Sequence, residues 1–194
     1  MSKVFVGLFI ALLFSSFHSN AQSRPKVTPQ MVVHRVDDTT KDASGWYYAK
    51  STGGNFSVSL PTRFSDFTIQ EASTKRAKKV SKMYVVGGSN LQGIKFSVTK
   101  MPMASDGSFE TLVKEMTTLS LPPGTPSKLK KEKYQHHNSI SVTTTKDSVG
   151  GFTKYIELDN NYVMVQSIVF NTANKKEAAA CADRFFSSLK ILGD

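Results

Sequence analysis

The sequence has a single cysteine, Cys181, so no internal disulfide can brace the fold. It also lacks an apolar run long enough to span a bilayer, because Val4–Phe14 has about 11 residues and a spanning helix needs roughly 20. Acidic residues are few, with 15 against 25 lysines and arginines and a net charge of +10. These absences argue against a disulfide scaffold and a membrane-spanning helix, and they leave a basic chain stabilised by packing.

The first residues have the pattern of a cleaved secretory signal. Lys3 supplies a charged start, Val4–Phe14 an apolar stretch, and Ser19-Asn20-Ala21 the small residues that a signal peptidase requires. The mature protein is therefore expected to be secreted or periplasmic, with no transmembrane segment and a net charge of +9 after loss of Lys3. We predict three segments: a leader, 1–21, a polar tether, 22–45, and a single domain, 46–194.

Two local runs of basic residues, 75–79 and 128–133, carry much of the positive charge. In an exported protein the available polyanions are lipid head groups, lipopolysaccharide, acidic glycans and acidic proteins. Neither run is interleaved with aromatic residues as a stacking platform would be, so nucleic-acid binding is not expected. The alternative to a binding role is that the runs form solvated faces or protect a sheet edge. The candidate contacts for an anionic partner are Lys75, Arg76, Lys78, Lys79, Lys128, Lys130, Lys131 and Lys133.

Apolar periodicity predicts an α+β domain. A period of i, i+3, i+4 and i+7 predicts a helix over 109–116 with Ser108 as its N-cap. Asn174 with Glu177 predicts a capping-box-like start to a final helix. Segment 162–170 is apolar at both alternating sets of positions, which is typical of a central strand covered on both faces. We expect a largely antiparallel sheet of about five to seven strands covered by helices. Alternation predicts strands at 54–61, 83–86, 94–99, 131–136, 140–145, 152–158 and 162–170.

The order of these elements resembles the PsbP/Mog1-like family. Phe56–Pro61 followed by Phe64 is similar to the family's opening strand, which ends in proline. The strand over 162–170 and the helix that ends in Phe185–Ile191 are similar to its closing elements. The resemblance covers roughly residues 46–191 and implies an α/β/α sandwich used mainly as a binding or accessory module. It implies no catalytic residue.

No catalytic motif is present in the sequence. It contains no Gly-x-Ser-x-Gly elbow, Ser-x-x-Lys pair or phosphate-binding loop, so we expect no enzyme and no cofactor. His136 and His137 are candidate metal ligands, although neighbouring residues of a strand point to opposite faces and could share an ion only across a turn. We therefore expect an exported, non-enzymatic binding or accessory protein of the cell envelope that meets an anionic partner through a basic surface. The alternative is a small metal-dependent protein or enzyme that uses His136 and His137.

The aromatic cluster Trp46-Tyr47-Tyr48 allows two interpretations. It could line a ligand groove, or it could pack in the core and close a sheet edge.

Overall fold

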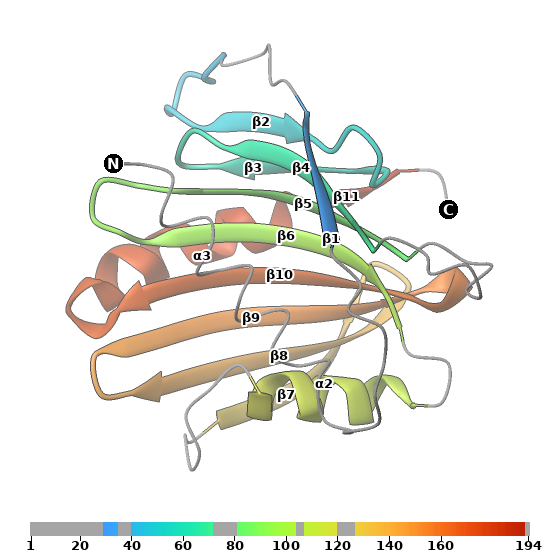
Figure 1. The fold of residues 1–194 in the computed structure, drawn as a ribbon. Coiled ribbons are helices and arrows are strands. Elements are labelled where there is room, and N and C mark those ends of the chain that lie inside the picture. The colour runs from blue at the N-terminus through green and yellow to red at the C-terminus, as the bar shows by residue number, and fades with distance from the viewer. Residues whose placement is uncertain (1–28, 35–39, 72–80, 104–106, 120–126, 193–194) are drawn as a thin grey trace.

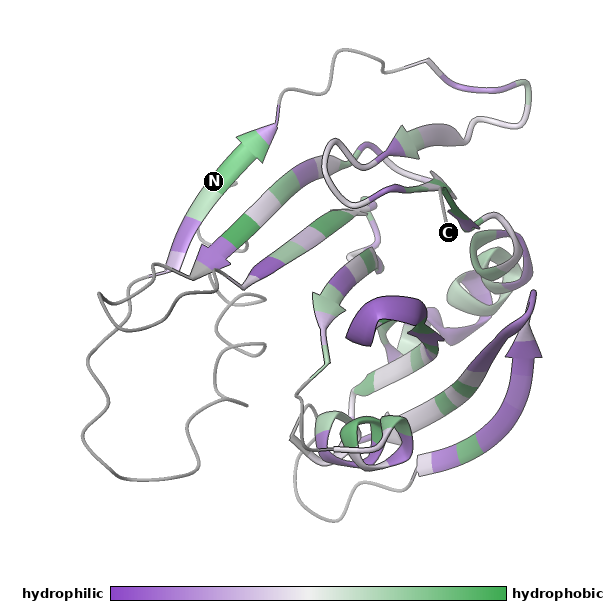
Figure 2. Ribbon diagram, turned by 90° about the vertical axis from the view of Figure 1, so that its right-hand side faces the viewer, coloured by the Kyte–Doolittle hydropathy of each residue, from purple (hydrophilic) through white to green (hydrophobic). Residues whose placement is uncertain are grey.

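The computed structural model describes residues 29–34, 40–71, 81–103, 107–119 and 127–192 (Figure 1). Within these ranges an antiparallel sheet of eight strands forms the body of the protein, in the order β1-β4-β5-β6-β10-β9-β8-β7. The sheet is strongly curved (Figure 2). Its strands are β1 (Pro29–His34), β4 (Ser65–Glu71), β5 (Lys82–Ser89), β6 (Lys95–Pro102), β7 (Ser127–Tyr134), β8 (His137–Lys146), β9 (Val149–Leu158) and β10 (Tyr162–Asn171).

A smaller sheet and one helix cover one face of the large sheet. Phe185 is fully buried in this layer, and its ring centroid lies 5.5 Å from that of Phe96 and 5.3 Å from that of Phe186. Gln166 Nε2 donates to the Phe185 carbonyl at 2.6 Å and so ties the end of the helix to β10. The elements of this layer are the helix α3 (Lys175–Ser187) and the strands β2 (Tyr47–Lys50), β3 (Phe56–Leu60) and β11 (Lys190–Ile191), in the order β11-β3-β2.

The helix α2 (Phe109–Leu119) covers part of the opposite face. Ser108 Oγ accepts a hydrogen bond from the Thr111 amide at 3.2 Å, so Ser108 caps the helix as predicted. Val113 is fully buried between α2 and the sheet. In the described ranges no helix is both long enough and apolar enough to cross a membrane.

α3 begins directly after Asn174, where the final helix was expected to start, but its capping differs from the prediction. A short 3-10 helix, η3 (Thr172–Asn174), precedes it, and a second, η2 (Asp159–Asn161), joins β9 to β10. Asn174 does not form the expected side-chain cap, because its Nδ2 atom donates to the Gln92 carbonyl at 2.8 Å instead.

β10 is a central strand, as predicted, with β6 and β9 as its neighbours. Met164 packs on the α3 side and Val163 on the α2 side, so helices lie on both faces. The sheet is nevertheless larger than the five to seven strands expected, because the described residues form an eight-stranded and a three-stranded sheet. The unpredicted strand β4 has only Phe67 and Ile69 as large apolar residues, too few for a clear period-2 signal.

Part of the predicted tether belongs to the fold, which corrects the expectation for residues 29–34 and 40–45. β1 pairs with β4 along its whole length, and Lys41 forms an isolated bridge with Tyr47. Asp42 accepts hydrogen bonds from Ser44 and from the Trp46 amide, and these lower the pKa of its carboxyl to about 2. Arg184 of α3 pairs with Asp42 and lies over the Trp46 ring. The predicted leader, 1–21, lies outside the described residues.

Candidate binding site

The two faces of the large sheet carry side chains of different size. On β6, β9 and β10, most of the residues facing α3 are large and apolar, and they fill a core that contains Phe96, Met164 and Phe170. Because side chains alternate along a strand, the intervening residues face the α2 side. Many of those residues are serine, threonine, glycine or valine. The large sheet is therefore tightly packed on one face and sparsely filled on the other.

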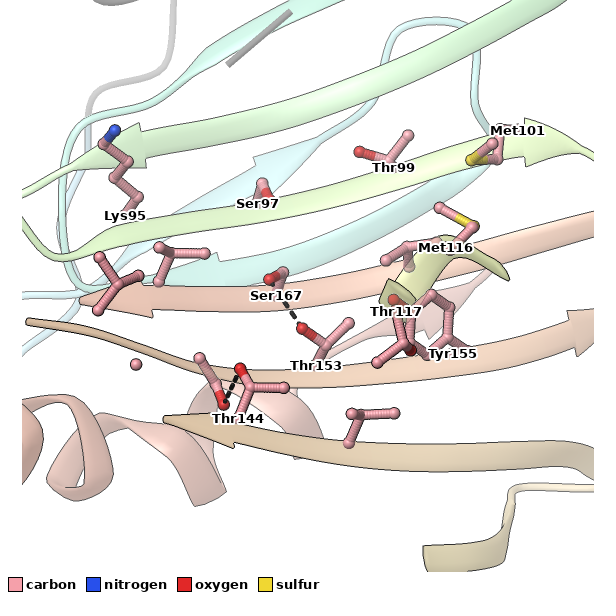
Figure 3. A pocket seen from close by; sticks show the side chains of 16 residues that line it. Lys95, Ser97, Thr99, Met101, Met116, Thr117, Thr144, Thr153, Tyr155 and Ser167 are labelled. Carbon is pink, nitrogen blue, oxygen red and sulfur yellow. Dashed lines mark hydrogen bonds between the residues drawn. The ribbon is translucent and has the colours of Figure 1, made fainter. Parts of the chain in front are cut away.

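A cavity of about 220 Å³ lies on the sparsely filled face, beside α2 (Figure 3). Its floor is formed by β6, β8, β9 and β10, and α2 closes one end through Met116 and Thr117. The lining residues are Lys95, Ser97, Thr99, Met101, Met116, Thr117, Val142, Thr144, Val149, Gly150, Gly151, Thr153, Tyr155, Val165, Ser167 and Val169.

The strand register aligns hydroxyl groups across the middle of the floor. Ser97 of β6 lies opposite Ser167 of β10, which lies opposite Thr153 of β9. The Thr153 and Ser167 hydroxyls share a hydrogen bond of 3.1 Å, which Figure 3 shows. Gly151 lies two residues before Thr153, at the next position of β9 on this face, and its lack of a side chain keeps the adjacent floor open.

The hydroxyls of Ser97 and Thr99 border the cavity, whereas the lining hydroxyl that is buried without a partner among the described residues is that of Thr117. Ser97 is 8% exposed and Thr99 is 5% exposed, and neither side chain bonds to any described residue. Figure 3 shows both among the residues that line the cavity. A hydroxyl that borders a cavity can donate or accept a hydrogen bond with whatever occupies the cavity. Ser97 and Thr99 are therefore available to a polar group that enters the cavity.

The α2 end of the cavity is apolar and holds a neutral phenol. Met101, Met116 and Tyr155 meet there (Figure 3). Burial raises the pKa of the Tyr155 hydroxyl, and the nearby Thr117 hydroxyl only partly opposes this shift. The opposite end is open, and the rim residue Val149 is 53% exposed.

The four predicted basic residues that the structure describes, all on β7, do not share one face. β7 is an edge strand, and its lysines alternate, so that Lys128 and Lys130 point to one face and Lys131 and Lys133 to the other. Figure 2 shows β7 as an almost uniformly hydrophilic edge. Lys131 Nζ pairs with Glu110 at 2.5 Å, and the other basic run, Lys75, Arg76, Lys78 and Lys79, lies outside the described residues.

Glu132 brings the lysines of β7 and β9 together. Lys154 Nζ lies 3.0 Å and Lys130 Nζ 3.3 Å from the Glu132 carboxylate, which also accepts from Ser141 Oγ at 2.6 Å. The Lys154 ammonium is 5.2 Å from the centroid of the Tyr134 ring. Burial acts to raise the pKa of the Glu132 carboxyl, but the hydrogen bonds from Ser141 and Lys154 outweigh it and leave this pKa below its ordinary value.

Replacing Glu132 is expected to destabilise the protein in a pH-dependent way. Glu132→Gln leaves the 17%-exposed Lys154 without its carboxylate. We expect a loss of about 1–3 kcal/mol at pH 7, less than for a fully buried pair because both side chains retain some solvent. The lowered pKa means that the carboxylate stabilises the fold above its ordinary pKa and that this contribution disappears as the pH falls through the folded-state pKa. Urea unfolding measures the free energy of unfolding that Glu132→Gln loses relative to the unmodified protein. This loss should be smaller at pH 3 than at pH 7.

The control for this prediction is Glu110→Gln. It removes an ion pair whose partners are 62% and 71% exposed, and such pairs contribute at most about 1 kcal/mol. Equal losses of stability in the two variants would show that Glu132 stabilises the fold no more than an exposed ion pair does.

The histidine pair lies at the β7–β8 turn. The His136 and His137 ring centroids are 3.9 Å apart, with His136 exposed and His137 buried at 5% exposure. In the part of the chain that the structure describes, no group of three or more histidine, cysteine, aspartate or glutamate side chains is arranged to hold a metal ion. Among the described residues, His136 and His137 therefore have no third side chain of these types beside them.

The aromatic cluster lies at the edge of the small sheet, away from the cavity. Tyr47 is buried, Tyr48 is 53% exposed and Trp46 lies under Arg184. Of its two interpretations, core packing with closure of a sheet edge agrees with this arrangement.

Comparisons with known proteins find structural similarity without sequence similarity. No protein-family model matches the chain, and no curated protein matches it significantly. The solution structure of cyanobacterial PsbP (CyanoP) from Synechocystis sp. PCC 6803 is similar over 77% of this chain and 94% of that one, with 9% identity and a TM-score of 0.49. The crystal structure of LpqN, involved in cell envelope biogenesis of Mycobacterium tuberculosis, covers 91% of this chain and 88% of its own, with 8% identity and a TM-score of 0.40. A PsbP structure is thus among those similar to this chain, as the order of elements predicted.

Proposed function

We propose that this chain is an exported, non-enzymatic binding protein of the cell envelope, and that it holds a small, mostly apolar molecule in the cavity beside α2. The observation that carries the proposal is the cavity itself, where the Ser97 and Thr99 hydroxyls and the buried Thr117 hydroxyl, which has no partner among the described residues, border a lining rich in valine and methionine. Ligand sites combine an apolar lining with a few polar groups in this way. The leader pattern of residues 1–21 supports export to a secreted or periplasmic location.

The lining favours binding over catalysis. Catalysis by proton transfer requires an acid or base whose pKa lies near the working pH. The titratable residues among the sixteen described lining residues are Lys95 and Tyr155, and burial raises the pKa of Tyr155 further from neutrality. We therefore assign the cavity a binding role and propose no reaction.

A basic surface that meets an anionic envelope partner remains a second part of the proposal. Its support is the net charge of +10. β7 contributes less positive charge to this surface than its lysines suggest. Lys130 and Lys131 form ion pairs with Glu132 and Glu110. Lys133 donates a hydrogen bond to Asn138. Binding to anionic vesicles should weaken as salt rises from 50 to 500 mM if this surface acts. Binding that does not change with salt would remove this part of the proposal.

Filling the cavity tests the binding role. Val165 lies in the floor and is half-buried, and Val165→Phe places a ring in the space beside α2. The neutral apolar fluorophore N-phenyl-1-naphthylamine should brighten on binding the purified protein, and Val165→Phe should weaken that binding about tenfold or more. Titration of probe fluorescence measures the effect.

The matched control is Val32→Phe, the same change at a 50%-exposed position of β1. It should leave probe affinity within about twofold. Circular dichroism should confirm that both variants are folded. A folded Val165→Phe variant with normal probe binding would contradict the proposal.

A further inference from the structure

A buried threonine hydroxyl at the α2 end of the cavity has no hydrogen-bond partner among the described residues. Thr117 lies in the last turn of α2, is 8% exposed and lines the cavity (Figure 3). A threonine in a helix can satisfy its hydroxyl by donating to the carbonyl four residues earlier, as the adjacent Thr118 does to Lys114 at 2.8 Å. Thr117 instead retains an unsatisfied polar group in the interior, which costs free energy.

The hydroxyl of Tyr155 lies beside that of Thr117. Tyr155 is 4% exposed, and the Thr117 hydroxyl is close enough to lower the pKa of the Tyr155 hydroxyl, although burial raises this pKa more. The phenol therefore keeps its proton at neutral pH and can donate a hydrogen bond. Because the Thr117 hydroxyl is not bonded to that of Tyr155, an oxygen atom of a bound molecule can bond to both.

The side chains around these two hydroxyls are uncharged. Met101 and Met116 meet Tyr155 at this end of the cavity, and Val165 lies opposite Tyr155 in the register of β10 with β9. None of these described lining residues carries a charge at neutral pH. An ionised group placed among them would lose its water of hydration without gaining a counter-charge. The α2 end is therefore suited to a polar group that is neutral.

We propose that the ligand is an uncharged amphiphile whose single alcohol or ketone oxygen binds Thr117 and Tyr155, with its hydrocarbon chain directed toward Val149. This inference rests on the proposed function, because it assumes that the cavity holds a small molecule. Val149 lies at the open rim, six residues before Tyr155 on β9, which is about 20 Å at roughly 3.4 Å per residue. Val165 and Val169 of β10 form an apolar path between the two ends.

Alcohols and ketones share the chemistry that the two hydroxyls offer. A ketone oxygen can accept a hydrogen bond from each hydroxyl, whereas an alcohol can accept from one and donate to the other. A sugar fits less well, because it needs many hydrogen bonds and the Thr153 and Ser167 hydroxyls of the floor are already bonded to each other. The lining therefore favours a molecule that is hydrocarbon apart from one oxygen.

Four probes with eight-carbon chains test the anchor: 1-octanol, 2-octanone, 1-chlorooctane and octanoate, each displacing N-phenyl-1-naphthylamine from the purified protein. Thr117→Val and Tyr155→Phe each remove one hydroxyl and nearly keep the shape of the side chain. Each should weaken binding of 1-octanol and 2-octanone about three- to tenfold, the worth of one hydrogen bond, and leave 1-chlorooctane within about twofold. Octanoate should bind the unmodified protein at least about fivefold more weakly than 1-octanol.

Stability separates a ligand anchor from a structural role. Replacing an unpartnered buried hydroxyl with a methyl group removes a desolvation cost. Thr117→Val should therefore keep or raise the urea midpoint while binding of 1-octanol weakens. A hydroxyl that the fold itself needs would show the opposite, a lower midpoint.

Thr118→Val and Tyr48→Phe are the matched controls. Thr118 is exposed on α2, and its hydroxyl already donates to the Lys114 carbonyl. Tyr48 is 53% exposed on β2, in the small sheet. Both variants should bind all four probes within about twofold of the unmodified protein.

The outcomes separate this inference from the proposed function. If the probes bind but neither Thr117→Val nor Tyr155→Phe weakens 1-octanol or 2-octanone, the anchor is overturned while the cavity remains a binding site. An equal loss for 1-chlorooctane, or octanoate bound as tightly as 1-octanol, would overturn it too. If neither the fluorophore nor any of the four probes binds, the proposed function fails as well. A loss confined to 1-octanol and 2-octanone supports both, and the probe with the larger loss identifies the preferred oxygen.

Discussion

Phe185→Ala is expected to destabilise the protein by about 3–5 kcal/mol, the usual cost of truncating a buried phenylalanine. Phe185 is fully buried, and its ring packs edge-to-face against Phe96 of the large sheet. Its carbonyl accepts the hydrogen bond from Gln166, so a shift of α3 would also expose this buried amide. The denaturant midpoint from urea unfolding measures the loss.

The adjacent Phe186→Ala variant provides the control for this truncation. Phe186 is only half-buried, and its ring centroid lies 5.8 Å from the ammonium of Lys154. The same loss of a ring should therefore cost less than in Phe185→Ala, by at least about 1 kcal/mol. Similar losses at the two positions would mean that α3 is not anchored through Phe185.

Gly88→Ala is expected to cost about 2–4 kcal/mol, because a methyl group at this position has no room. Gly88 lies on β5 opposite Phe96, and a Cβ atom there would collide with the backbone carbonyl oxygen of Arg63. Backbone atoms cannot rotate away as a side chain can. The segment that follows β3 would have to move off the large sheet, which should also lower the cooperativity of unfolding.

Gly107→Ala is the matched control for the glycine change. A Cβ atom at Gly107 meets nothing within 4 Å, so the substitution should change stability by less than about 0.5 kcal/mol. Thermal unfolding of the two variants should differ clearly. Normal stability in Gly88→Ala would contradict the close approach of the Arg63 segment to β5.

Most strands of the large sheet could be predicted from the sequence, because apolar and polar residues alternate clearly along them. The alternation of Phe96 and Val98 with Ser97 and Thr99 predicts a strand with one apolar face, and β6 is that strand. β1 escaped prediction because its apolar residues Met31, Val32 and Val33 are consecutive and exposed, which gives no alternating pattern. Its position at an edge is set by pairing with β4, a contact between distant segments.

The candidate site was harder to predict than the fold. Ser97 and Thr99 lie on the polar side of β6, and on a half-buried strand such residues normally face water. They are buried because α2 and the curved β8–β10 region enclose that side, and α2 comes from a separate segment of the chain. The conspicuous lysines of β7 lie on an edge strand and are divided between two faces, where their charges suit edge protection.

The sequence alone determined which residues share a face, because side chains alternate along every strand. Lys95, Ser97, Thr99 and Met101 must point the same way once β6 forms. Only the tertiary structure decided what that face meets. α2 has 11 residues and is therefore about 16 Å long, whereas the 10 residues of β10 extend about 34 Å. A helix of that length covers the Met101 end of the face and leaves the Lys95 end open, and this difference in length produces the cavity.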